Sequence, residues 1–206
     1  MEPKELFFEE RESLVYTLKS LTPEQWDAPS LCAGWRVRDV VGHMVTGFQL
    51  SLPAVLVKTA RAGFNINKAS ARGGRDFGSR PTEELLSAIE SPTELSGFAK
   101  VLGYPKLIPD VTIHHEDIRR GVGLAPHVVP AERMKYSLSA LRKDTGPLKA
   151  KKRTQGLRFV ATDLDWAEGE GPEVRGPAMS LLLAMGGRGV AIDDCEGDGV
   201  TVLRSR

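Results

Sequence analysis

Four histidines are the residues of this chain best suited to metal or acid–base chemistry, and one of them stands in a clear pattern. Asp110 and His114 lie four residues apart in the segment IPDVTIHHEDIRRGVG. On a helix this spacing stacks the two side chains on one face, within reach of a single ion. Asp117 continues that face. The pair predicts part of a metal site, and a solvated polar face is the alternative.

His43 is the candidate for a third ligand from a different helix. Apolar residues from Val37 onward follow helical spacing and predict a helix that continues to about Lys58. His43 lies about 130° from the centre of this apolar stripe, so it does not simply fill the core. A solvated histidine is the alternative. Should the two helices pack together, two histidines and one carboxylate would leave open coordination positions, which is the stoichiometry of a catalytic metal site.

The other histidine of the pair, His115, falls on the apolar stripe of the same helix, with Val111 and Ile118. This position favours a core histidine whose ring is hydrogen-bonded, and not a metal ligand.

Hydrophobic spacing, prolines and glycines predict the elements that must position these residues. Thr22 is expected to cap a short turn that places Trp26. Further helices are expected near residues 7–21, 82–89, 92–98, 109–118 and 130–141. Residues 61–80 carry glycines and basic groups without periodicity and predict a long loop. Such a loop, with Arg75 in it, could close over an anionic substrate, or it could be simply solvated.

A basic stretch marks the predicted domain boundary. We expect a helical bundle over residues 1–142, a basic linker over 143–154 and a small C-terminal domain over 155–206. In that domain, residues 157–162 and 199–206 alternate like strands, and 174–189 predict a helix. The fold class is therefore α+β. Arg188, after this helix, is a candidate for binding a substrate anion, and a cation at the helix C-terminus is the alternative.

Composition limits the classes of partner. Lysine and arginine number 28 against 27 acids, so the net charge of +1 gives no reason to expect nucleic acid or an anionic membrane. No stretch approaches the roughly 20 apolar residues that span a bilayer, and the acidic N-terminus does not resemble a signal peptide. Cys32 and Cys195 form no paired framework and are expected to be buried thiols. We therefore predict a cytoplasmic protein, of an oligomeric state that the sequence does not specify.

Two motifs resemble the mycothiol-dependent maleylpyruvate isomerase family, part of the DinB-like superfamily of metal-binding helical bundles. The first is a tryptophan, then Cys-x-Gly-Trp, then Val-x-Asp-Val-x-x-His; it is matched by Trp26, Cys32, Gly34, Trp35, Val37, Asp39, Val40 and His43. The second is a carboxylate followed after three residues by His, then x-x-Asp-[Ile/Leu]-Arg-Arg and a glycine. It is matched by Asp110, His114, Asp117, Ile118, Arg119, Arg120 and Gly123. The resemblance implies a DinB-like four- or five-helix bundle followed by a small α+β C-terminal domain.

The resemblance also implies a metal site. In that family the corresponding residues bind a divalent metal, commonly Zn²⁺, which implies His43, Asp110 and His114 as ligands here. Asp110 stands where the family usually has glutamate, whose side chain is one methylene longer. Asp39 lies one turn before His43 and could orient its imidazole, and Asp117 could support His114 in the same way.

These features predict a divalent-metal-dependent transferase or isomerase that uses a low-molecular-weight thiol on a small electrophilic substrate. The resemblance implies mycothiol as cosubstrate. A metal with open positions would favour the thiolate, the nucleophilic form of the thiol. One alternative is a non-catalytic protein that binds a small ligand or partner with weak or no metal. Another is a metal-dependent hydrolase, which would need no thiol. No side chain is identified as a general base.

Overall fold

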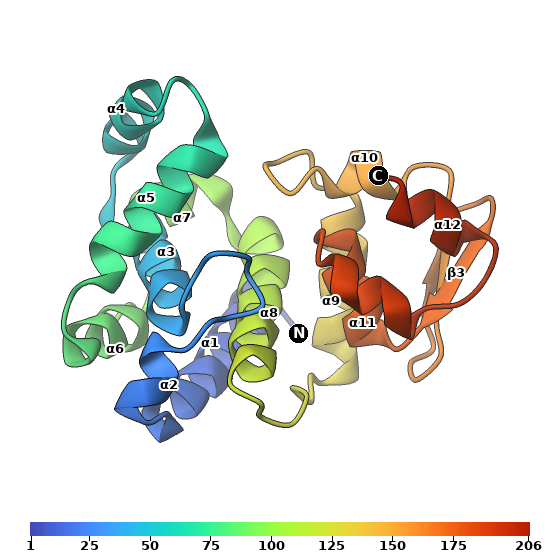
Figure 1. Cartoon of the computed structure of the whole chain (residues 1–206), viewed down its shortest axis with the longest axis horizontal. Helices are drawn as coiled ribbons and strands as arrows, with labels where there is room; N and C mark the ends of the chain where they lie inside the picture. Colours follow the sequence, from blue (N-terminus) through green and yellow to red (C-terminus); the bar gives the residue numbers. More distant parts are fainter. The chain divides into compact units, whose positions relative to one another are not determined.

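The structure is a computed structural model that describes all 206 residues, Met1–Arg206, and it is α+β as expected (Figure 1). Contacts divide the chain into two units, Met1–His127 and Val128–Arg206. The division falls after His127 and not after Arg142, because the helix predicted over 130–141 belongs to the C-terminal unit.

The N-terminal unit is helical throughout. Its helices are α1 (Pro3–Ser20), α2 (Pro23–Asp27), α3 (Val37–Gln49), α4 (Leu52–Arg61), α5 (Ile66–Gly78), α6 (Thr82–Glu90), α7 (Gly97–Leu102) and α8 (Tyr104–Gly121). Helix α3 contacts α5, α6, α7 and α8, and α1 packs on α8 and α6. The core contains Phe7 and Leu14 of α1, Val40 of α3 and Ile113 of α8. This bundle confirms the expected architecture.

Several helix boundaries differ from the prediction for local reasons. Helix α3 ends at Gln49 instead of continuing to Lys58, because Ser51 caps a new helix and Pro53 occupies its first turn. Helix α8 begins at Tyr104, so Pro109 lies inside it and not at its start. The capped turn that places Trp26 is present as α2, where Thr22 Oγ1 accepts a hydrogen bond from the Gln25 amide.

The loop predicted over residues 61–80 is wrong, because most of it forms α5. Its glycines serve close packing between helices and not chain flexibility. A Cβ atom on Gly42 of α3 would overlap the backbone of Gly74 and Gly78 of α5. A Cβ on Gly74 would likewise lie 2.8 Å from the carbonyl oxygen of Asp39. Small residues thus let the α3 and α5 backbones approach to contact, and this brings Ser70 of α5 toward His43.

The C-terminal unit combines a three-stranded sheet with helices. Its elements are α9 (Ala131–Arg142), α10 (Ala150–Thr154), β1 (Arg158–Ala161), β2 (Ala167–Glu168), β3 (Glu173–Gly176), α11 (Ala178–Met185), the 3₁₀ helix η1 (Gly189–Asp194) and α12 (Gly199–Arg204). The strand order is β2–β1–β3, with β1 antiparallel to β2 and parallel to β3. Every residue of α11 is buried, which makes this helix the centre of the unit.

Helix α9 is tied to this unit by packing and by polar contacts. It packs on α11 and buries Met134, Leu138 and Leu141. Trp166 Nε1, near β2, donates a hydrogen bond to Ser139 Oγ of α9 at 3.0 Å. The predicted basic linker ends in α10, whose Ala150 is buried.

One of the two strands predicted in the C-terminal domain is wrong. The strand expected over 157–162 is present as β1, but residues 199–206 form α12 and not a strand. Gly199 and Leu203, four residues apart, are the buried residues of this segment, and α12 packs on β3. Its apolar residues thus bury one helical face. None of the helices combines the length and the apolar character that crossing a bilayer requires.

The α3–α5 contact generates a stability prediction. We expect Gly42→Ala to lower the free energy of unfolding by about 1–3 kcal/mol, because the added methyl group overlaps backbone atoms that cannot move independently. The measurement is chemical denaturation. Gly47→Ala is the matched control on the same helix, since its nearest neighbour would be the Ala99 methyl at 4.0 Å. Equal stability of the two variants would contradict the proposed packing role.

Candidate metal centre

The predicted ligands His43, Asp110 and His114 come together where α3 packs on α8. Their candidate ligand atoms, one from each residue, all lie within 4.8 Å of one another. Two atoms that each lie about 2.1 Å from a zinc ion are at most about 4.2 Å apart, so small side-chain rotations suffice to bring this set onto one ion. The structure therefore brings one side chain of α3 and two of α8 close together.

The His114 ring is held from its far side by Asp117. His114 Nδ1 lies 3.0 Å from Asp117 Oδ2, and the Asp117 side chain is fully buried. Since a carboxylate can only accept, Nδ1 carries the proton and Nε2 faces Asp110, whose Oδ1 lies 3.7 Å away. A carboxylate behind a ligating histidine fixes the ring and raises its basicity. Asp117 thus occupies the supporting position expected for it.

The His43 ring is held in a comparable way by Ser70, a residue that no sequence pattern indicated. His43 Nδ1 and Ser70 Oγ lie 2.9 Å apart, so this hydrogen bond orients the ring from the side of Nδ1. Asp39 does not take this supporting role. Its two oxygens are engaged by the Arg36 guanidinium and backbone amide at 3.0–3.1 Å, so Asp39 secures the start of α3 instead.

Trp35 lies against both imidazoles. Its ring meets His43 edge-on at 5.2 Å between centroids and is nearly parallel to His114 at 6.4 Å. Asp110, by contrast, retains 33% of its side-chain exposure, whereas His114 retains 7%. The site is therefore buried on the His114 side and open to solvent beside Asp110.

Electrostatics favour a positive charge at this position. Burial by itself lowers the pKa of His114, but the Asp110 carboxylate, the hydrogen bond with Asp117 and the nearby Cys32 outweigh burial and raise that pKa to about 10. Without a metal, this raised pKa favours the doubly protonated, positively charged His114 imidazole beside the Asp110 carboxylate. A divalent cation bound by two imidazoles and a carboxylate would supply positive charge at the same place. The donor set therefore fits a divalent metal.

Cys32 belongs to the support of this site, although the sequence predicted only a buried thiol. It is half-buried, and its Sγ donates to Asp117 Oδ2 at 3.0 Å and lies 3.7 Å from His114 Nδ1. The Leu31 amide also donates to the Asp117 carbonyl oxygen at 2.9 Å. The Cys-x-Gly-Trp motif thus ties the connector after α2 to α8.

Three other residues considered in the sequence are not members of this ligand set. Arg75 is exposed on α5. Arg188 belongs to the C-terminal unit, where its guanidinium donates to the Gly186 carbonyl oxygen at the end of α11, a contact typical of a helix C-terminal cation. His115 is fully buried and hydrogen-bonded, as its position on the apolar stripe indicated. Its ring takes part in a second cluster.

Comparisons with known proteins agree with the fold. Residues 7–95 match the family model described as the mycothiol maleylpyruvate isomerase N-terminal domain, a range that includes His43 and ends before Asp110. Two solved structures of the mycothiol-dependent maleylpyruvate isomerase, one of them a histidine-to-alanine mutant, are similar in fold. Each is 15% identical, with a TM-score of 0.59, over 95% of this chain and 91% of the other. No curated protein matches the chain.

The different partners of Ser70 and Asp39 generate a prediction about zinc affinity. We expect Ser70→Ala to weaken by about 10- to 100-fold the binding of the ion that His43→Ala abolishes, because the His43 ring loses its fixed orientation. Asp39→Asn is the control and should leave this affinity unchanged in the folded protein. Competition titration against a chromophoric chelator measures both. If Asp39→Asn lowered zinc affinity as much as Ser70→Ala, this would contradict the conclusion that Ser70, and not Asp39, orients the His43 ring.

The raised pKa of His114 generates a pH prediction. A metal binds the imidazole only after the Nε2 proton has left, and the fraction of His114 in that form rises tenfold per pH unit below a pKa of about 10. We therefore expect zinc affinity to increase about tenfold per unit between about pH 6 and pH 8. Titrations in buffers of different ionisation enthalpy should show the released proton. A zinc affinity that does not change with pH would contradict the raised pKa of His114.

Proposed function

We propose that the chain is a divalent-metal-dependent enzyme that uses a low-molecular-weight thiol, because residues 7–95 match the mycothiol maleylpyruvate isomerase N-terminal domain family model. The proposed reaction is an isomerisation or S-transfer on a small electrophilic substrate, with mycothiol as the thiol and Zn²⁺ as the metal. The proposal rests above all on the convergence of His43, Asp110 and His114 from two helices.

Three protein ligands are the number expected of a catalytic centre. Structural zinc sites are closed by four protein ligands, whereas catalytic sites keep a position for water or substrate. Here the exposed side of Asp110 provides that access, and the buried side is occupied by supporting groups. The metal, when bound, would favour the thiolate form of a thiol and stabilise anionic charge beside it.

The chain's own residues would orient and shield the reacting groups. Asp117 holds the proton on His114 Nδ1, and Ser70 bonds to His43 Nδ1, so each of the two rings is held by a hydrogen bond at that nitrogen. Trp35 lies against both rings and keeps water from that side. A thiol therefore approaches on the side of Asp110, and an electrophilic carbon must lie next to it for attack.

Activity assays test the proposal. The zinc-loaded protein should convert maleylpyruvate, or a related activated alkene, only when mycothiol is present. His43→Ala and Asp110→Asn should each lower kcat/KM by about 100-fold or more, because either change removes a ligand and lowers metal occupancy. Asp76→Asn, an exposed carboxylate on α5, is the control that should retain activity.

Other outcomes identify the alternatives. Turnover that needs zinc but no thiol would replace the proposal with a metal-dependent hydrolase. A folded protein that binds no zinc at His43 and shows no turnover would indicate a non-catalytic protein that binds a small ligand or a partner.

A further inference from the structure

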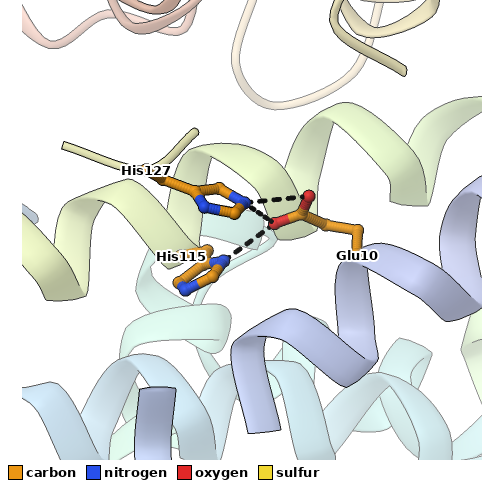
Figure 2. A group of neighbouring side chains, drawn as sticks. All are labelled: Glu10, His115 and His127. Carbon is orange, nitrogen blue, oxygen red and sulfur yellow. Dashed lines mark hydrogen bonds and ion pairs between the residues drawn. The ribbon is translucent and has the colours of Figure 1, made fainter. Parts of the chain in front are cut away.

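A second group of potential ligands lies inside the N-terminal unit, away from the centre described above. It consists of Glu10 of α1, His115 of α8 and His127 of the segment after α8, here named the Glu10 cluster (Figure 2). Glu10 and His115 are fully buried, and the His127 side chain retains 6% of its exposure. The cluster thus joins α1 to α8 and to the segment that directly follows α8.

The three side chains point toward one another. Glu10 Oε1 lies 2.8 Å from His115 Nδ1 and 2.9 Å from His127 Nε2, and Glu10 Oε2 lies 3.1 Å from His127 Nε2. The two imidazole centroids are 4.0 Å apart. Figure 2 shows both ring nitrogens directed at the carboxylate. Two nitrogens and two oxygens therefore surround one small space with the donor types that zinc prefers.

The far side of the His115 ring is supported in the manner of a metal ligand. His115 Nε2 lies 2.8 Å from Thr17 Oγ1, and Arg119 donates to the same hydroxyl oxygen at 3.0 Å. If His115 Nδ1 binds a metal, its proton moves to Nε2 and donates to Thr17, whose oxygen can accept both bonds. The surrounding hydrogen bonds therefore permit the tautomer that a metal requires.

His127 is positioned although it lies outside any helix. Its backbone amide donates to Glu116 Oε2 at 2.9 Å, and the other oxygen of Glu116 accepts from Arg120 at 2.7 Å. Glu116 is fully buried on α8, directly after His115. The ligand that comes from an irregular segment is thus fixed to the helix that carries another ligand.

We propose that Glu10, through both carboxylate oxygens, together with His115 and His127, forms a second divalent-metal site. Its four protein donor atoms make it a site of a structural kind that links α1, α8 and the segment following α8. His114 and His115 would then serve different ions, since adjacent helix residues point about 100° apart. The Glu10 cluster is closed to solvent, unlike the side of Asp110, so the second ion stabilises the fold and takes no part in turnover. This inference goes beyond the proposed function and does not depend on it.

Zinc retention in variants of the whole chain tests the inference. The His43→Ala/Asp110→Asn double variant removes the first site. After chelator treatment and reloading with Zn²⁺, it should retain about one ion per chain, and zinc should raise its melting temperature. Adding His127→Gln should weaken the remaining binding by about 100-fold or more and abolish the thermal shift. The glutamine amide can still donate to Glu10, so the metal-free stability of the double and triple variants should be similar.

A second variant and a spectroscopic measurement distinguish the loss of a metal ligand from misfolding of the variant. His115→Asn likewise retains a donor toward Glu10 and should also abolish the remaining zinc binding. In the double variant, zinc should shift the ring ¹⁵N resonances of His115 to the tautomer protonated at Nε2 and those of His127 to the tautomer protonated at Nδ1.

The results distinguish this proposal from that of the first site. If the first site fails to bind metal, the unmutated chain and the double variant each hold one ion, and the second site stands. A folded double variant that binds no zinc, or a triple variant that binds it as tightly as the double variant, overturns the second site.

Discussion

A fully buried carboxylate, Asp117, is the contact on which the candidate metal centre depends. It accepts from His114 Nδ1 and from Cys32 Sγ, and its backbone carbonyl accepts from Leu31. Burying such a charge without partners costs several kcal/mol, so the partners are necessary to the fold as well as to the site. One residue thus fixes the tautomer of a candidate ligand and attaches the connector that carries Trp35 to α8.

The sequence predicted those parts of the site that depend on local spacing. Asp110 and His114 are one helical turn apart, and helical periodicity alone places them on one face. That His43 meets them depends on how α3 packs on α8, which spacing does not specify; the family resemblance supplied that step. Asp39 shows the limit of such reasoning. It lies on the same face as His43, but the adjacent Arg36 offers its carboxylate a stronger, charged partner.

Residues brought together by tertiary packing could not be predicted. Ser70 was missed because its segment, rich in glycine and basic residues, has the composition of a loop. Its glycines instead permit close approach to α3, a use that only the partner helix reveals. Glu10 and His127 were missed for a related reason, since no local pattern connects positions so far apart. The 199–206 segment was predicted as a strand because alternation over so few residues does not distinguish a strand from one buried helical face.

The aspartate at position 110 has a structural explanation in these contacts. Its shorter side chain keeps the carboxylate close to α8, yet Oδ1 still lies 3.7 Å from His114 Nε2 on the same helix. That separation is already within the roughly 4.2 Å allowed to two ligand atoms of one zinc ion, so Asp110 and His114 can share an ion that His43 reaches from α3. Close packing holds α3 and α5 together, Ser70 bonds to Nδ1 of the His43 ring, and a ligand atom of His43 lies within 4.8 Å of those of both residues on α8. Exchanging glutamate for aspartate here would thus change where an ion sits along the α3–α8 contact, while the three side chains still converge.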